Sequence, residues 1–310
     1  MNAARIESKI AWMAAVVAAL VCLSGCRQAE PPRPAAAPKA AAPAKPPKTS
    51  KPQAQQGKEG SAPAKTAQPV AQKSPWRQLH PGMEARRWKI DGQALAYVVR
   101  LDADKWSLRA ALASDLPAPK DQPERKDALA PLRRAPEFVE HASTAALAIN
   151  GGFFDPDLKP MGLRISQGKQ RVAFRKADWG VFYTAASDGR PGLVHASDWK
   201  SAPKADFAIE CGPRLVVDGA PLKLKPNLHR RSAIGHDAVG RIFIIATVDA
   251  VDLNTLASAM ASPVDKGGLG LVGALNLDGG PSTQLYVRDA SSWKISGLTG
   301  VADAVLAFPR

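Results

Sequence analysis

Short apolar runs separated by turn-forming glycine, proline and aspartate residues fill the chain from residue 76 to its end. Ala94–Arg100 and Trp106–Ala113 are two such runs with a polar segment between them, which predicts a β-hairpin. Lys126–His141 spaces its apolar residues by three and four and contains two prolines, which predicts an interrupted helix. We also expect a short helix at Asn254–Ala261, capped by its first residue, and a last strand at Ala304–Phe308.

Two of the apolar strand patterns end in a short polar side chain that is followed by two glycines. Glycine lets the backbone adopt positive φ and approach a bound group closely. Two polar groups placed at strand ends beside flexible backbone are therefore expected to face one common pocket. The residues concerned are Asn150, Gly151 and Gly152 at one corner, and Asp278, Gly279 and Gly280 at the other.

The second corner continues with Pro281, Ser282 and Thr283. Backbone N–H groups that converge in such a turn bind anions, and the two hydroxyls add donors for a phosphate or a sugar. An alternative interpretation is purely structural. In it, Asp278 caps the backbone of its own tight turn, and Asn150 forms a turn of the same kind.

Two further charged residues are candidates for chemistry. Glu210 lies in an apolar strand pattern one residue from the break at Gly212-Pro213, and a carboxylate exposed to a cavity or raised in pKa suits a general acid. Its alternative is an outward-facing strand position. Arg231 offers a fixed fork of donors to a phosphate, although an arginine pair is also typical of solvated surface.

The N-terminal region is unlike the rest of the chain. Residues 1–26 combine basic residues, a short apolar run and small residues before Cys26, which predicts an export signal rather than a retained anchor helix. Leu23-Ser24-Gly25-Cys26 resembles the bacterial lipobox, whose cysteine is lipidated. We therefore expect a protein that is exported and attached to a bacterial membrane, at the periplasmic side or the cell surface, through lipid on Cys26.

Residues 27–75 consist mostly of Ala, Pro, Lys, Gln and Ser, which predicts a disordered tether, and residues 76–310 form the expected folded domain. The tether carries nine Lys or Arg against two Glu, so half of the formal net charge of +14 belongs to it. The domain shows no recognition helix and no basic-aromatic stripe, so nucleic acid is not an expected partner. A basic tether suits anionic lipid or an acidic wall polymer.

Four motifs in this order resemble the phosphodiester glycosidase family, over roughly residues 88–308. The resemblance implies a single α+β domain with a mixed, largely antiparallel β-sheet and a few helices. It also implies hydrolysis of a sugar-1-phosphodiester. The motifs are Asn150-Gly-Gly-Phe-Phe-Asp155, Gly212-Pro-Arg-Leu-Val-Val-Asp-Gly219, Arg231-Ser-Ala-Ile-Gly235 and Asn276-Leu-Asp-Gly-Gly-Pro-Ser-Thr283.

By these motif positions, Asp278 is the implied general acid/base or nucleophile and Arg231 holds the phosphate. Asn150, Ser282 and Thr283 are implied to bind sugar hydroxyls or phosphate oxygens. Glu210 departs from the family pattern, in which an amide is common beside the Gly-Pro pair.

The function expected from these features is an exported, lipid-anchored glycosidase that acts on sugar-1-phosphodiester or related linkages of an envelope or extracellular polysaccharide. A non-catalytic lipoprotein that binds an envelope glycan in the same pocket is the alternative, and a structural assembly factor is a third interpretation. No cofactor is required for this hydrolysis. Acidic corners are also compatible with a divalent cation such as calcium, although no ligand set is legible in the sequence.

Overall fold

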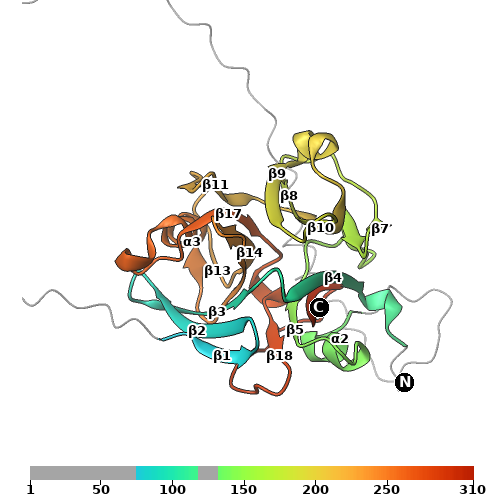
Figure 1. Cartoon of the computed structure of the whole chain (residues 1–310), viewed down its shortest axis with the longest axis horizontal. Helices are drawn as coiled ribbons and strands as arrows, with labels where there is room; N and C mark the ends of the chain where they lie inside the picture. The colour runs from blue at the N-terminus through green and yellow to red at the C-terminus, as the bar shows by residue number, and fades with distance from the viewer. Residues whose placement is uncertain (1–74, 118–131) are drawn as a thin grey trace, which may run out of the picture. The chain divides into compact units, whose positions relative to one another are not determined.

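The computed structural model describes residues 75–117 and 132–310, which lie within one compact unit, Ala67–Arg310 (Figure 1). The predicted signal segment with Cys26 lies outside the described residues, and so does the predicted tether apart from Pro75. No helix among the described residues is long and apolar enough to cross a membrane.

The largest sheet has eight strands in the order β1-β2-β3-β15-β14-β17-β11-β12. Its strands are β1 (Arg77–His80), β2 (Met83–Ile90), β3 (Ala94–Leu101), β15 (Ile242–Thr247), β14 (Ser232–Asp237), β17 (Leu271–Asn276), β11 (Arg214–Val217) and β12 (Ala220–Pro221).

Strand β15 shows why part of the sequence reads as a continuous apolar run. Its residues Ile242 and Ile244 pack into one hydrophobic cluster, and the intervening Phe243 and Ile245 pack into another on the opposite face of the sheet. Successive side chains of a strand point to opposite faces, so a strand covered on both faces needs apolar residues throughout. Helix α3 (Leu253–Ala261) contributes to the second cluster through Leu253, Leu256, Ala257 and Met260.

A five-stranded sheet carries two of the strand ends that form the candidate site. The order is β19-β18-β5-β20-β4, with β19 (Lys294–Ile295), β18 (Leu285–Val287), β5 (Leu147–Asn150), β20 (Asp303–Pro309) and β4 (Trp106–Leu112). Asn150 is the last residue of β5 and pairs with Ala304 of β20. Helix α2 (Ala135–His141) packs against this sheet through Phe138 and Val139.

A second five-stranded sheet follows the order β7-β6-β10-β8-β9, and Figure 1 shows β8, β9 and β10 gathered together. Its strands are β7 (Lys169–Val172), β6 (Arg164–Ser166), β10 (Ala205–Cys211), β8 (Gly180–Ala185) and β9 (Pro191–His195). The short strands β13 (Leu228–His229) and β16 (Val251–Asp252) form a separate pair, and the 3₁₀ turns are η1 (Ala113–Asp115), η2 (Ala196–Ser201), η3 (Val264–Lys266) and η4 (Gly280–Ser282).

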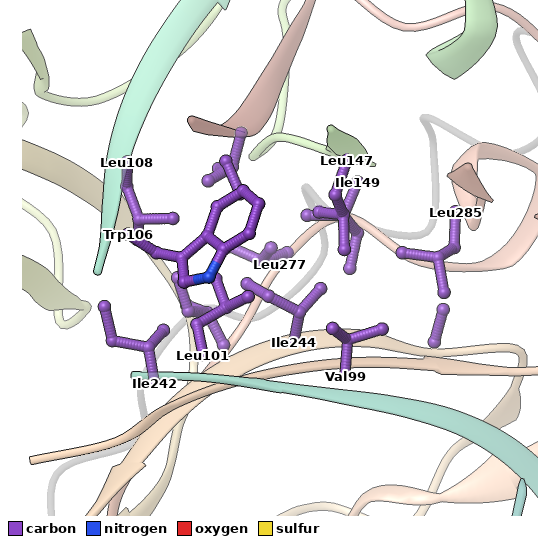
Figure 2. Close-up of a cluster of buried hydrophobic side chains, with 14 of the residues drawn as sticks. Val99, Leu101, Trp106, Leu108, Leu147, Ile149, Ile242, Ile244, Leu277 and Leu285 are labelled. Atoms are coloured by element: carbon purple, nitrogen blue, oxygen red, sulfur yellow. The ribbon is translucent and has the colours of Figure 1, made fainter. Parts of the chain in front are cut away.

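The main hydrophobic cluster joins all three large sheets. Figure 2 shows side chains of β3 and β15 facing those of β4, β5 and β18, with Trp106 among them. Phe182, Phe207 and Ile209 join the same cluster from the second five-stranded sheet. Each fully buried aliphatic or aromatic side chain contributes about 1.5–3 kcal/mol to folding, so this cluster fixes the sheets that carry the strand ends. Its labelled members are Val99, Leu101, Trp106, Leu108, Leu147, Ile149, Ile242, Ile244, Leu277 and Leu285.

The structure confirms a largely antiparallel β protein with few helices and corrects three details. Every strand pair among the described residues is antiparallel, so the sheet is not mixed. Strands β3 and β4 do not form a hairpin, because β3 pairs with β2 and β15 while β4 pairs with β20. Asp252, rather than Asn254, caps helix α3.

The helix expected at Lys126–His141 is described only from residue 132 onward, and there it begins at Ala135. Pro136 lies in the first turn of the helix, where proline is tolerated because no intrahelical N–H bond is lost. The last strand begins at Asp303, one residue earlier than expected. The added residue, Asp303, belongs to the candidate active site described below.

Candidate active site

The two polar corners that follow β5 and β17 are hydrogen-bonded to each other. The side-chain amide of Asn150 donates to the carbonyl oxygen of Asp278 at 2.7 Å. In return, the backbone N–H of Asp278 donates to the carbonyl oxygen of Gly151 at 3.1 Å. The two strand ends, 128 residues apart along the chain, therefore form one structure.

Asn150 uses its whole hydrogen-bonding capacity inside the protein. Its Nδ2 donates to the carbonyl oxygens of Asp278 and Gly151, and its Oδ1 accepts from Ser232 Oγ at 2.6 Å and from the Gln284 N–H at 3.1 Å. The side chain has no exposed surface. An amide has two donor hydrogens and two acceptor positions, so none remains for a sugar. Asn150 thus positions the Asp278 corner, and the expected ligand contact from this residue is corrected.

Asp278 is the half-buried carboxylate at the centre of this corner. Its pKa is raised to about 6, mainly by burial and to a smaller extent by the nearby charge of Asp303, whereas hydrogen bonds from the Ser282 side chain and the Gly279 backbone oppose the rise. The Gly279 N–H donates to Oδ1 at 2.9 Å. A carboxyl group with this pKa changes protonation near neutral pH, which suits an acid or a base in catalysis.

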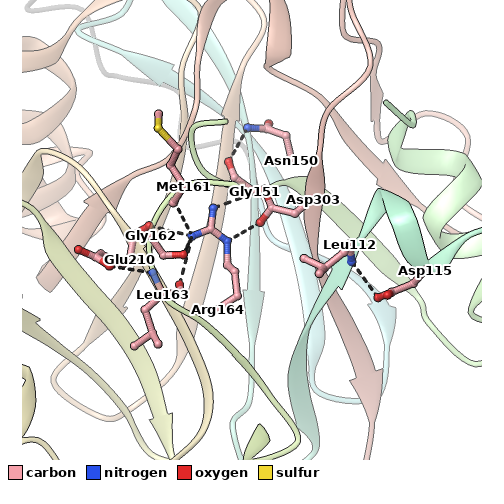
Figure 3. Close-up of polar contacts among 10 residues, drawn as sticks. All are labelled: Leu112, Asp115, Asn150, Gly151, Met161, Gly162, Leu163, Arg164, Glu210 and Asp303. Atoms are coloured by element: carbon pink, nitrogen blue, oxygen red, sulfur yellow. Dashed lines mark hydrogen bonds and ion pairs between the residues drawn. The ribbon is translucent and has the colours of Figure 1, made fainter. Parts of the chain in front are cut away.

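A buried ion pair that the sequence analysis missed lies behind the two corners. Arg164 Nε donates to Asp303 Oδ2 at 2.5 Å, and the two side chains are 0% and 1% exposed (Figure 3). Arg164 Nη1 also donates to four backbone carbonyl oxygens, those of Met161, Gly162, Leu163 and Glu210. Asp303 opens the apolar strand β20, and that placement was the available signal, because a carboxylate in a buried strand needs a partner.

The glycines of the first corner serve close packing. A Cβ atom on Gly151 would overlap the Asp303 carboxylate, and one on Gly152 would lie 2.5 Å from Arg164 Nη2. Neither residue has positive φ. At the second corner only Gly280 has positive φ, at 58°, whereas a Cβ atom on Gly279 would lie 2.8 Å from the Arg230 carbonyl oxygen. The expected conformational role of glycine therefore applies to one position of the four.

The backbone N–H groups of the second corner do not form an open anion-binding nest. The N–H of Asp278 donates to Gly151, that of Gly279 to the Asp278 carboxylate, and that of Gly280 to the Arg230 carbonyl oxygen at 2.8 Å. The two N–H groups after Pro281 donate to carbonyl oxygens within the turn itself. Asp278 therefore does cap its own turn, as the structural interpretation expected, while the residue as a whole is only half-buried.

The two hydroxyls of this corner are buried. Ser282 is 5% exposed, and its side chain is hydrogen-bonded to Asp278. Thr283 has no exposed surface, and its Oγ1 has no hydrogen-bond partner among the described residues. Ser282 therefore holds the carboxylate in place, and direct contact of either hydroxyl with a sugar is not available in this conformation.

Glu210 is buried without exposure and acts as an anchor. Its Oε2 accepts from the N–H groups of Leu163 at 2.7 Å and Arg175 at 2.9 Å, which fixes the segment after the first corner. Its Oε1 is buried without a partner among the described residues. A carboxylate held in this way does not reach a substrate, so the expected catalytic role of Glu210 is replaced by a positioning role.

Arg231 points away from the Asp278 corner. Its guanidinium donates to the carbonyl oxygens of Val251, at 3.1 Å, and of Asn227, and its side chain is 6% exposed. The neighbouring Arg230 instead follows the Gly280–Thr283 turn, where its Nη2 donates to the Thr283 carbonyl oxygen at 3.1 Å. Of the two arginines, Arg230 is thus the one whose guanidinium contacts the Gly280–Thr283 turn.

Aromatic and thiol groups line the other side of the first corner. Phe153 and Trp179 have ring centroids 5.3 Å apart, and the Arg175 guanidinium lies 5.6 Å from the Trp179 ring. Burial raises the pKa of the Cys211 thiol to about 12, so this thiol stays protonated and unreactive. Within residues 75–117 and 132–310, no group of three or more His, Cys, Asp or Glu side chains is placed to hold a metal ion.

More than half of the chain matches a known protein family. The profile of the phosphodiester glycosidase family matches residues 143–307, which include both corners and the Arg164–Asp303 pair. The uncharacterized protein YigE of Escherichia coli K12 is 33% identical over 92 residues, covering 27% of this chain and 34% of YigE. The chain thus spans about a third of that relative.

Two solved structures share the fold at 17% sequence identity. The catalytic domain of zebrafish N-acetylglucosamine-1-phosphodiester alpha-N-acetylglucosaminidase, auto-inhibited by its pro-peptide, has a TM-score of 0.53, with 79% of this chain and 91% of that chain covered. A hypothetical protein from Synechocystis has a TM-score of 0.52, with 77% and 65% covered. The family match over more than half of the chain shows that this protein belongs to the phosphodiester glycosidase family.

Proposed function

We propose that this protein is an exported glycosidase, anchored to the membrane by lipid on Cys26, that hydrolyses sugar-1-phosphodiester or related linkages in an envelope or extracellular polysaccharide. Family membership supports a glycosidase-type hydrolase, and it implies a sugar phosphodiester as substrate. The observation that carries the proposal is the half-buried Asp278 carboxylate, whose pKa is raised to about 6, at a corner assembled from distant strand ends.

The chemistry of the linkage favours Asp278 as a general base. A phosphomonoester leaves as a stable anion, so the departing oxygen needs little protonation, whereas the attacking water must lose a proton. In the proposed step, ionised Asp278 takes a proton from water while the water oxygen bonds to the anomeric carbon. The bond from that carbon to the phosphate oxygen breaks, and the phosphomonoester keeps its electron pair.

The buried ion pair sets the charge around this base. The Asp303 charge raises the pKa of Asp278, and the Arg164 guanidinium, bonded to Asp303 at 2.5 Å, compensates part of that charge. Opposite charges at this separation oppose the shift that two neighbouring carboxylates would cause alone. Arg164 is therefore a positioning residue that limits the rise in the pKa of Asp278 caused by Asp303.

Arg230 is the proposed source of positive charge for the phosphate. It is half-buried beside the Gly280–Thr283 turn, and its guanidinium donates to the carbonyl oxygens of Thr283 and Ser296 at 3.1 and 3.2 Å. A guanidinium fixed by two such bonds loses little further freedom when it binds a phosphate.

The test is release of sugar from an N-acetylglucosamine-1-phosphodiester, the linkage named for the zebrafish structural neighbour. Purified protein is expected to release free sugar and a phosphomonoester, and an Asp278→Asn variant is expected to be folded and inactive. Asp218→Asn is a matched control, because Asp218 is exposed in a hairpin turn whose positive φ of 50° suits asparagine. Equal turnover by Asp278→Asn would exclude the proposed base.

A non-catalytic glycan-binding lipoprotein is the second candidate function. It is favoured by one observation, that Asn150, Ser282 and the backbone N–H groups of the corner are already engaged within the protein. Incubation with a panel of sugar-1-phosphodiesters from pH 4 to 9 separates the two functions. Binding without release of sugar at any pH would support the binding protein and contradict the enzyme.

A further inference from the structure

A cavity of about 840 Å³ lies on the sheet β7-β6-β10-β8-β9, outside the Asp278 corner. Its wall comes from two segments, residues 170–178 and the 3₁₀ turn η2 with the histidine that precedes it. Its volume falls within the range of about 300–1,000 Å³ that is typical of sites for small ligands. None of the site residues discussed above lines it.

Two aromatic side chains provide apolar surface in this cavity. Phe174 and Trp199 line it, and both pack against a small buried cluster formed by Leu163, Val181, Ala205 and Ala208. The Trp199 ring also contacts Tyr183 at 5.9 Å between centroids. Both side chains are half-buried, because they pack against this cluster and also line the cavity. They can therefore serve as a fixed surface for stacking.

A hydrogen-bonded pair supplies polar groups beside the aromatic rings. His195 Nδ1 accepts the Ser197 N–H at 3.1 Å, and its Nε2 is hydrogen-bonded to Asp178 Oδ1 at 2.7 Å. Asp178 is 97% exposed, and its Oδ2 makes no hydrogen bond within the described residues. A carboxylate that is oriented by one oxygen and open at the other is suited to accept a ligand hydroxyl.

The charge of the cavity is net positive. Lys176 and Lys200 line it and are exposed, and neither forms an ion pair with a described residue. Asp178 is the single acidic residue in the lining. Two mobile ammonium groups against one carboxylate favour a ligand with negative charge.

We propose that this cavity binds an acidic oligosaccharide segment, with sugar rings stacked on Phe174 and Trp199, hydroxyls bonded to Asp178, and carboxylate or phosphate groups bound by Lys176 and Lys200. The aromatic rings match the apolar C–H faces of sugar rings, and the rim matches their hydroxyls and acidic substituents. The choice of a saccharide rests in part on the proposed glycosidase function.

The cavity shares a wall with the first glycine corner. Within the segment 174–179, Phe174 and residues 176–178 line the cavity, whereas Arg175 and Trp179 do not. Arg175 and Trp179 pack together on the side of Phe153, which follows the Gly151-Gly152 corner. A polysaccharide bound in the cavity would therefore lie next to the segment that also packs on the Gly151-Gly152 corner. The cavity would give an extended polysaccharide a second contact with the protein.

The experiment measures binding of trigalacturonate by calorimetry, using the Asp278→Asn protein so that turnover does not interfere. Binding that weakens with rising salt is expected, with maltotriose, the uncharged trisaccharide, bound at least tenfold more weakly. Trp199→Ala and, separately, Phe174→Ala are each expected to weaken trigalacturonate binding about tenfold. If circular dichroism shows that one of these two variants has not folded, trigalacturonate binding by the other variant tests the proposal.

Charge reversal has a matched control. Lys176→Glu combined with Lys200→Glu is expected to weaken binding at least tenfold. Lys89→Glu combined with Lys294→Glu, which changes the net charge equally at exposed positions on β2 and β19, is expected to leave it unchanged.

The inference is overturned if trigalacturonate does not bind, if these cavity variants bind it as the parent does, or if inorganic phosphate alone binds equally tightly. Absence of sugar release with intact trigalacturonate binding would contradict the proposed function and leave this inference standing. Sugar release without trigalacturonate binding would overturn this inference alone.

Discussion

The side-chain amide of Asn150 donates to the backbone carbonyl oxygen of Asp278 at 2.7 Å. The end of one strand thereby holds the backbone that carries the candidate catalytic carboxylate. The other amide hydrogen of Asn150 is donated to the Gly151 carbonyl oxygen, and its Oδ1 accepts from Ser232 and Gln284.

Asn150→Ala is expected to destabilise the protein by roughly 2–4 kcal/mol, because several buried groups lose their partner at once. Urea denaturation measures this free energy of unfolding. The variant is also expected to lower kcat with little change in KM, since the carboxylate loses its support. A variant with unchanged stability would show that the four hydrogen bonds are not formed in solution.

The acid limb of the activity profile is expected to follow Asp278. A general base must be ionised, so kcat/KM falls as pH falls through about 6, by about tenfold per pH unit below it. Asp303→Asn removes a charge that raises the pKa of Asp278, so the limb is expected to move to lower pH. Activity that instead rises as pH falls through 6 would assign Asp278 as a general acid.

Removing the charge of Asp278 is expected to stabilise the fold at high pH. The carboxyl pKa rises from 3.8 in the unfolded chain to about 6 in the folded protein. The folded state therefore binds the proton more tightly, and stability is lost as pH rises through 6. Asp278→Asn should be more stable than the parent at pH 8, by about 1–2 kcal/mol after allowance for solvent exposure, and equally stable near pH 4. Thermal unfolding at the two pH values checks this.

The Arg164–Asp303 pair is expected to behave as a coupled unit. Arg164→Leu leaves a buried carboxylate without its partner and should cost about 3–5 kcal/mol. The double variant Arg164→Leu/Asp303→Leu should cost less than the sum of the single changes, because no charge remains unpaired. Additive losses in chemical denaturation would contradict the coupling.

Replacing Arg230 is expected to affect mainly KM, whereas replacing Arg231 is expected to affect mainly the stability of the fold. Arg230→Ala should raise KM for a phosphodiester substrate, with a smaller effect on stability. Arg231→Ala removes bonds to the carbonyl oxygens of Asn227 and Val251, and should lower stability by about 1–3 kcal/mol with KM unchanged. The opposite pattern in kinetics and denaturation would restore Arg231 as the phosphate ligand.

The meeting of Asn150 and Asp278 could be predicted because both signals are local. Each residue follows an apolar strand and precedes paired glycines, and strand ends beside glycine commonly converge. Arg164 could not be predicted in this way, since it opens the three-residue strand β6 and its partner Asp303 is 139 residues away. Only the fold brings this pair together.

The hairpin expected at residues 94–113 shows the limit of local pattern. Asp102–Lys105 contains the turn signals, but β3 pairs with β15 and β4 with β20, and both partners come much later in the chain. The side-chain directions of Arg230 and Arg231 could not be predicted for a similar reason. Two exposed residues of β13 precede the pair, so the sequence offers no apolar alternation from which to read direction.

All the backbone N–H groups from Asp278 to Thr283 already donate hydrogen bonds within the protein. This turn therefore has its final geometry before any ligand binds. Hydrogen exchange there should already be slow in the free protein, and substrate should slow it little more. Selectivity among glycans would then reside in the neighbouring 153–179 segment, which can be rebuilt to accept another polymer while the carboxylate stays untouched.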